Sequence, residues 1–98
     1  MATYTVLANF IDQGIRNIQE TTHRAEAVEA AARKFGVTVK SIQWTLGAYD
    51  VICQFEAPDD QAITALGLML GSQGNVRTQT MRTFSRDEMN AILARAKG

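Results

Sequence analysis

The chain lacks several features that define common protein classes. Among its 98 residues there is one cysteine, Cys53, one histidine, His23, and one proline, Pro58. A single cysteine excludes an internal disulfide, and one cysteine with one histidine provides no ligand set typical of a zinc site. We therefore expect no metal and no other cofactor, and a reducing cytoplasm as the setting.

The chain also has no excess of positive or negative charge and no long apolar run. Lysine plus arginine and aspartate plus glutamate number ten each, so the formal net charge is zero. Because no basic run follows a phosphate backbone, nucleic acid is not an expected partner. The N-terminal segment MATYTVLANF does not resemble an export signal, and no stretch approaches the roughly 18 consecutive apolar residues of a membrane span. We expect neither export nor membrane insertion.

Regular strand and helix patterns run through the whole chain. Residues 3–10 alternate in the period of a strand, residues 39–57 indicate a hairpin, and residues 75–85 indicate a last strand. Residues 11–22 are expected to form an ordered connection with a short helical turn. Helices are predicted at 23–36, ending at Gly36, at 60–74, capped by Asp59, and at 85–97, where Ser85 and Glu88 form a capping box.

The hairpin is expected to turn at Gly47 and Ala48. A two-residue type II′ turn suits this pair, because glycine supplies the positive φ at the first central position. Such a turn pairs Leu46 with Tyr49, Thr45 with Asp50 and Trp44 with Val51. Trp44 and Tyr49 are then interpreted as core residues whose polar tips reach the rim. The apolar face of the hairpin carries Ile42, Trp44, Leu46, Tyr49, Val51, Cys53 and Phe55.

The order of elements predicts an α+β fold of the ferredoxin-like type, β-α-β-β-α-β, with an extra C-terminal helix. Right-handed crossovers place the first strand between the third and the fourth. The helices then cover one face of the sheet, and the other face is expected to meet solvent or a second copy of the chain. That second face is predicted to carry Thr3, Thr5, Leu7, Asn9, Gln43, Thr45, Asp50, Gln54, Arg77, Gln79 and Met81.

Three segments resemble the GYD domain family, small bacterial proteins of mostly unassigned function. They are ANFIDQGIRN, WTLGAYDVICQFEAPDD and GSQGNVRTQTMRTFS, and the naming motif is carried by Gly47, Tyr49 and Asp50 with Ala48 interposed. The resemblance covers nearly the whole chain, so residues 1–98 are expected to be a single GYD domain. It implies a ferredoxin-like fold that assembles like the dimeric α/β-barrel proteins, and it implies no agreed activity.

One candidate site emerges from the predicted topology. Asn9, Asp50 and Arg77 fall on the same face and at the same edge of the sheet, and Gln13 and Arg16 leave the first strand there. Arginine and carboxylate groups together can hold a small polar or anionic ligand. The alternative is a structural ion pair between Asp50 and Arg77. His23 and Cys53 are interpreted as an exposed side chain and a small buried one, respectively.

Two classes of function remain open at this point. The first is a homo-oligomeric module that binds a small ligand or a partner. The second is a cofactor-independent enzyme of the dimeric α/β-barrel kind, such as a small monooxygenase or isomerase, acting in a cavity lined by the polar sheet face. The enzyme requires an enclosed pocket and a base with a shifted pKa.

Overall fold

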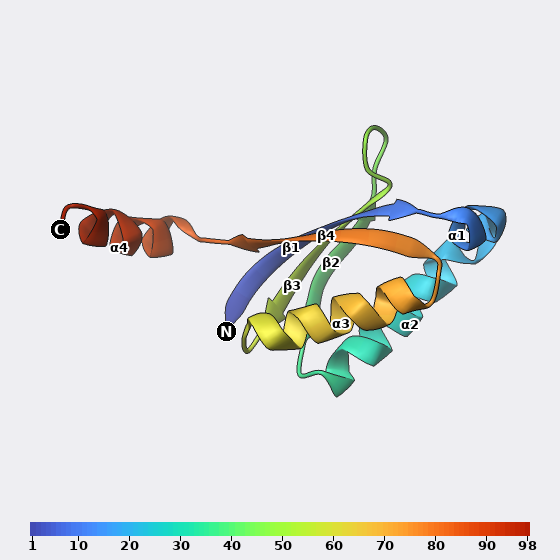
Figure 1. Ribbon diagram of the computed structural model, residues 1–98, viewed down its shortest axis with the longest axis horizontal. Helices are drawn as coiled ribbons and strands as arrows, with labels where there is room; N and C mark the ends of the chain where they lie inside the picture. Colours follow the sequence, from blue (N-terminus) through green and yellow to red (C-terminus); the bar gives the residue numbers. More distant parts are fainter.

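The computed structural model describes residues 1–98 and has the predicted order of strands and helices. Strand β1 is followed by two short helical segments that form the predicted connection. The last helix, α4, extends away from the rest of the fold (Figure 1). The elements are β1 (Ala2–Phe10), α1 (Asp12–Arg16), η1 (Ile18–Glu20), α2 (Thr21–Lys34), β2 (Thr38–Trp44), β3 (Val51–Ala57), α3 (Asp60–Ser72), β4 (Val76–Thr83) and α4 (Arg86–Ala96).

The sheet is four-stranded and antiparallel, in the order β2-β3-β1-β4. Strand β1 therefore lies between β3 and β4, as the crossover rule predicts. Helices α2 and α3 lie on one side of this sheet, and no helix covers the other side (Figure 1). The fold is thus the predicted ferredoxin-like α+β arrangement with an added C-terminal helix.

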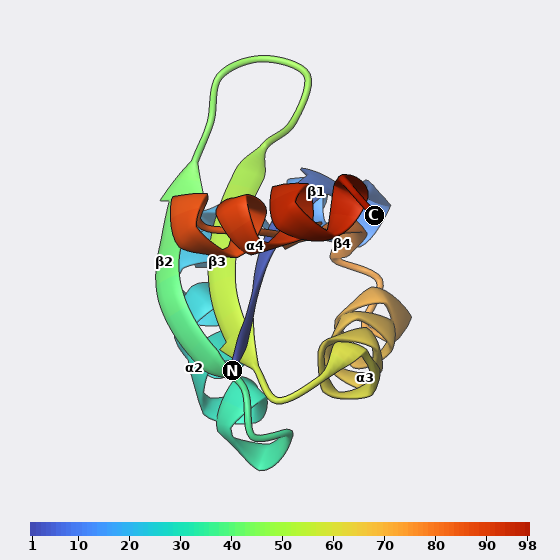
Figure 2. The same ribbon diagram turned by 90° about the vertical axis from the view of Figure 1, so that its left-hand side faces the viewer.

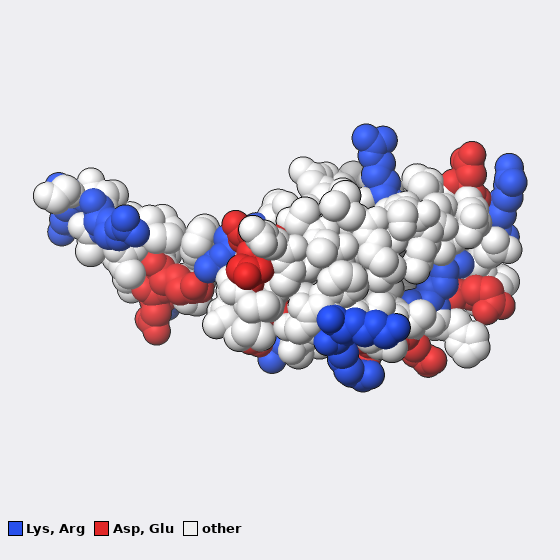
Figure 3. All heavy atoms as spheres, turned by 60° about the horizontal axis from the view of Figure 1, so that its bottom comes forward, with Lys and Arg blue, Asp and Glu red and all other residues white.

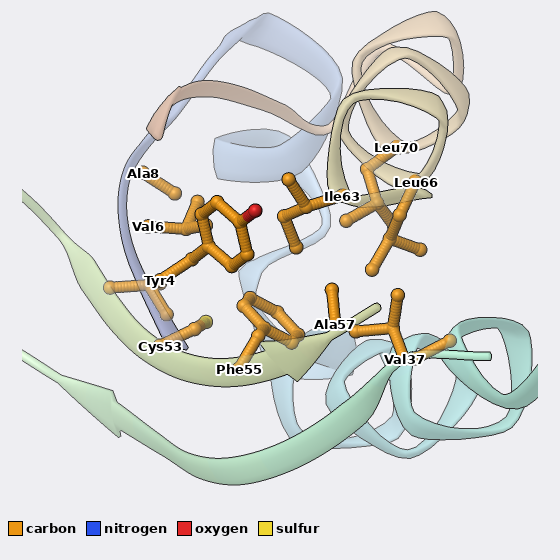
Figure 4. Packing of buried hydrophobic residues seen from close by; sticks show 12 residues of the cluster. Tyr4, Val6, Ala8, Val37, Cys53, Phe55, Ala57, Ile63, Leu66 and Leu70 are labelled. Atoms are coloured by element: carbon orange, nitrogen blue, oxygen red, sulfur yellow. The ribbon is translucent and has the colours of Figure 1, made fainter. Parts of the chain in front are cut away.

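The buried core lies between the sheet and helices α2 and α3. Tyr4 and Phe55 from the sheet face Ile63 and Leu66 from α3, and all of them are nearly inaccessible to solvent (Figure 4). In β3 the burial alternates strictly, which is the pattern of a strand with one covered face. The helix stripe predicted from Ile63, Leu66 and Leu70 is the buried side of α3.

The predicted helix ends are found in the structure. Asp59 accepts a hydrogen bond from the Ala62 amide at 2.8 Å. Ser85 and Glu88 form the reciprocal capping box at the start of α4. Gly36 follows α2 with a φ of 72°, a conformation that glycine adopts without strain. Helix α2 begins at Thr21, two residues before the predicted start at His23, because η1 leads directly into it.

The pairing of β2 with β3 follows the predicted register from Ile42 to Trp44, and a bulge between Val39 and Ser41 shifts it by one residue toward the start of β2. The predicted turn is wrong. Trp44 pairs with Val51 and Ile42 with Cys53. Thr45 and Asp50 still share one backbone hydrogen bond, and beyond it residues 45–50 form an open loop that projects beyond the strand ends (Figure 2). Gly47 has a φ of 140°, far from the value of about 60° that a type II′ turn requires. Leu46 does not pair with Tyr49 and is fully exposed.

The sheet face away from the helices carries a mixed set of polar and apolar side chains, which we call the uncovered face. Val6 and Ala8 are buried on the helix side, so Leu7 points the other way. It lies between Ile52 of β3 and Gln79 of β4. Thr5, in the neighbouring row, donates to Gln54 at 2.9 Å and pairs with Met81, which is 40% exposed. The predicted membership of this face is confirmed for these strand positions.

Candidate functional site

Asp50 fixes loop 45–50 to the end of β1. Its amide donates to the Ala8 carbonyl, and its carboxylate accepts a hydrogen bond from the Phe10 amide, each at 2.9 Å. The carboxylate therefore extends the contact between β1 and β3 one step beyond their last register pair, Ala8 and Val51. Charged acceptors of this kind are stronger than neutral ones. Asp50 is thus a backbone clamp at the root of the loop.

Tyr49 secures the same loop from a different direction. Its hydroxyl donates to the Gln79 side chain on β4 at 2.9 Å. Because Gln79 lies beside Leu7 on the uncovered face, the predicted position of Tyr49 in the helix-facing core is wrong. The chain has left the sheet before Tyr49, so the alternation of a strand no longer determines where its side chain points. Thr45 makes two hydrogen bonds at the base of the loop. Its amide donates to the Asp50 carbonyl at 2.9 Å, and its hydroxyl donates to the Tyr49 carbonyl at 2.5 Å.

The other residues of the predicted polar cluster lie around the same end of β1. Asn9 and Arg77 are register partners in adjacent strands. Gln13 donates to the Gln73 carbonyl at 3.4 Å and to the Asn75 side chain at 3.2 Å, so it holds the turn that leads into β4. Arg16 lies at the exposed last turn of α1 and makes no hydrogen bond or ion pair.

Asp50 and Arg77 do not form an ion pair within the chain. The salt bridges join His23 to Glu26, Lys40 to Glu56 and Arg82 to Glu88. The carboxylate of Asp50 bonds to the Phe10 backbone, and the Arg77 side chain is exposed. The structure therefore brings Asn9, Asp50 and Arg77 to one end of the sheet, but it uses Asp50 for a backbone contact.

Sequence reasoning missed a second polar cluster, at the opposite end of the sheet. The Tyr4 hydroxyl donates to the Asp60 carboxylate at 2.5 Å, and this hydrogen bond raises the pKa of Tyr4, with burial adding to the effect. The Arg82 guanidinium lies 5.7 Å from the Tyr4 ring centre and 4.5 Å from that of Phe84. It also bonds to the Thr83 carbonyl and to Glu88 at 3.4 Å. The sequence offered one signal for this cluster: Tyr4 lies in a predicted strand, and a tyrosine that is buried needs a hydrogen-bond partner for its hydroxyl.

Cys53, His23 and Trp44 occupy ordinary structural positions. Cys53 is buried, and desolvation raises the pKa of its thiol to about 11, so little of it is thiolate at neutral pH. His23 is exposed, with its Nδ1 atom 3.7 Å from Glu26. Trp44 lies on the helix side and donates to the Thr21 hydroxyl at 3.0 Å, although its side chain is 44% exposed rather than buried.

One apolar cavity lies on the helix side of the sheet. It measures about 80 Å³ and is lined mostly by apolar side chains from α2 and the sheet, among them Val28, Ile42 and Phe55. Tyr4, Cys53 and Glu88 have shifted pKa values, and these three residues lie away from the uncovered face.

Charged side chains are distributed without a dominant sign. On the side of the molecule drawn in Figure 3, lysine and arginine occur in small groups interspersed with aspartate and glutamate. This distribution agrees with the formal net charge of zero. A chain with zero net charge has no net charge that would steer a strongly charged partner toward it from a distance.

Comparison with known proteins places the chain in a family. The model of the GYD domain matches residues 4–93, which is nearly the full length. The chain belongs to the GYD domain family. One similar protein is the glutamine synthetase and cystathionine beta-lyase binding protein of Thermus thermophilus. It is 33% identical to this GYD chain over 94 residues, which cover 95% of this chain and 99% of that protein.

Two crystal structures share the fold of this GYD chain. MtbAldR aligns with a TM-score of 0.67 at 13% identity, over 87% of this chain and 54% of that one, so this chain spans about half of it. TTHA0845 from Thermus thermophilus aligns with a TM-score of 0.55 at 21% identity, over 87% of this chain and 95% of that one. Both support the ferredoxin-like class. None of the helices in the GYD chain combines the length and the apolar character of a membrane span.

Proposed function

We propose that this GYD chain is a homo-oligomeric module that binds partner proteins through loop 45–50. The observation that carries the proposal is the fully exposed Leu46 on a loop whose root is held by Asp50, Tyr49 and Thr45. A pre-ordered loop loses less conformational entropy on binding than a mobile one, and an apolar side chain at its tip is a suitable anchor. In this proposal the family motif serves to present Leu46.

The name of the Thermus thermophilus relative supports partner binding, since that protein is described as binding two enzymes. The proposal places this chain in the cytoplasm, where its single buried Cys53 stays reduced. Copies of the chain are proposed to associate through the uncovered face, which combines Leu7, Ile52 and Met81 with hydrogen-bonding side chains. This assembly corresponds to the dimeric α/β-barrel arrangement that the family resemblance implies.

The test uses purified glutamine synthetase and cystathionine beta-lyase as probes in a surface binding assay. We expect the chain to bind at least one of them, and Leu46→Asp to weaken that binding by roughly ten- to a hundredfold, because it removes a buried leucine from the contact. Leu68→Asp is the matched control: Leu68 is 71% exposed on α3, away from the loop. Absence of binding up to about 100 µM, or equal effects of the two substitutions, would contradict the proposal.

Asp50 allows the structural and ligand-binding interpretations of the polar cluster to be separated. We expect Asp50→Ala to lower the free energy of unfolding by about 1–2 kcal/mol, because the Phe10 amide loses its acceptor. Asp50→Asn should cost less, since its amide oxygen can accept the same bond. Denaturant unfolding measures both.

Arg77→Gln tests the proposed small anionic ligand directly. Arg77 is exposed and makes no ion pair, so the change should alter stability by less than about 0.5 kcal/mol. If Asn9, Asp50 and Arg77 hold an anion, the same change should abolish binding of inorganic phosphate measured by calorimetry. Equal phosphate binding by the two proteins, or none by either, would leave Asp50 with its structural role alone.

A further inference from the structure

Helix α4 has no packing partner within its own chain. None of its residues is buried, and it extends beyond the end of β4 (Figure 1). Its side chains reach the body of the fold through Glu88, which bonds to Arg82. Arg82 in turn is held against the rings of Tyr4 and Phe84. The direction of α4 is therefore set by specific contacts at its first turn.

The helix is nevertheless amphipathic. Met89, Ile92 and Leu93 are spaced three and four residues apart and lie on one side, with exposed fractions of 44%, 36% and 50%. We call these three residues the α4 stripe. Phe84, just before the helix, is 51% exposed. The chain thus ends in a series of large apolar side chains in contact with water.

An isolated helix of this length is marginal in water even when its sequence favours helix. Helix α4 has 11 residues and one well-formed end, the Ser85–Glu88 capping box. Capping contributes on the order of 1 kcal/mol, which does not offset the cost of nucleating a short helix. Its stability therefore depends on burying the α4 stripe against something else.

The dimensions of the chain show how much surface is available for an interface. The accessible surface is 6672 Å², whereas a compact monomer of 10.8 kDa exposes about 5,500 Å². The radius of gyration is 14.8 Å, against about 13 Å for a compact domain of this length. The surface excess, more than about 1,000 Å² per chain, exceeds the roughly 800 Å² that each partner buries in a standard protein interface.

We propose that α4 is an arm that packs the α4 stripe against a second copy of this chain. The inference rests on the self-association in the proposed function. It adds a second contact between the two copies, at the end of the sheet opposite loop 45–50. A chain with zero net charge approaches its own copy without long-range repulsion. In a twofold dimer each copy makes the same contact with the other, so both α4 stripes are buried when the dimer forms.

The test measures self-association of the full chain by sedimentation and by size exclusion with light scattering. We expect a wild-type dimer at micromolar concentration and a rise of about a hundredfold or more in the dissociation constant for the double variant Ile92→Asp, Leu93→Asp. Ala94→Asp is the matched control, because Ala94 lies on the opposite side of α4 and should leave the dissociation constant unchanged.

A second variant guards against simple melting of the helix. Ile92→Ala with Leu93→Ala keeps the highest helix propensity and removes the apolar contact, so it should still weaken the dimer by about tenfold or more. A monomeric wild type, or alanine and aspartate variants that dimerise as the wild type does, would overturn the inference. If Leu7→Arg on the uncovered face disrupts the dimer while the α4 variants do not, the arm is refuted and the sheet contact of the proposed function stands.

Discussion

Replacing Tyr4 by alanine is expected to lower the free energy of unfolding by about 3–5 kcal/mol, the range for truncating a buried aromatic residue. Tyr4 is 2% exposed, and its ring fills the space between Val6, Phe55 and Ile63 (Figure 4). Small domains are stable by only about 5–15 kcal/mol, so the loss is a large share of the total. Denaturant unfolding followed by circular dichroism measures it. A loss below about 1 kcal/mol would show that the core is not built around this ring.

Tyr4→Phe separates the hydroxyl from the ring. It keeps the ring and removes the hydrogen bond to Asp60, so we expect a loss of about 1–2 kcal/mol. The pH dependence provides an independent check. Because the hydrogen bond to Asp60 raises the pKa of Tyr4 above its ordinary value of 10.0, the folded state holds this proton more tightly than the unfolded state does.

The stability contributed by Tyr4 is therefore complete below about pH 10 and is lost as the pH rises through the raised pKa. Cys53, with its pKa raised to about 11, acts in the same direction in both proteins. The difference between wild type and Tyr4→Phe thus isolates Tyr4 and should shrink as the pH rises through this range. A difference that stays constant over that range would contradict the assignment.

Gly14→Ala is expected to destabilise the fold by about 2–3 kcal/mol, through overpacking against rigid backbone. Gly14 is buried in α1, and a β-carbon there would overlap the carbonyl oxygen of Asn75. That carbonyl also accepts the Ile11 amide at 3.1 Å, so the clash acts on the junction of β1, α1 and β4. Thermal and denaturant unfolding measure the loss.

Gly71→Ala is the matched control for this change. Gly71 lies in α3, and a β-carbon there meets nothing within 4 Å. Alanine has the higher helix propensity, so this variant should be neutral or more stable by up to about 1 kcal/mol. If the two substitutions have the same effect, close packing at Gly14 is not the cause. The residues around Gly14 do not predict this close contact, because Asn75 approaches it from a distant segment of the chain.

How far the sequence predicts the candidate site is clearest at the β2–β3 hairpin. Its register could be predicted because apolar residues alternate on both strands, and a slip by one residue would put each on the wrong face. The path of loop 45–50 could not be predicted, because the apolar alternation continues to Leu46 although β2 ends at Trp44, and nothing local determines how the next residues leave the sheet. Asp50 shows the same limit: its place at the end of β1 was predicted, but its hydrogen bond to the Phe10 amide was not.

The sequence alone determined the class of fold, the strand order, the register, the capped helix ends and the family, because each depends on periodicity, local capping or short matching segments. The tertiary structure decided where Tyr49 points, which partner satisfies Tyr4, and that α4 stands away from the body. These features depend on contacts between segments far apart in the chain. A helical pattern shows that α4 has an apolar side. It does not say whether its own chain or a second copy covers that side, because the same stripe can be buried by either.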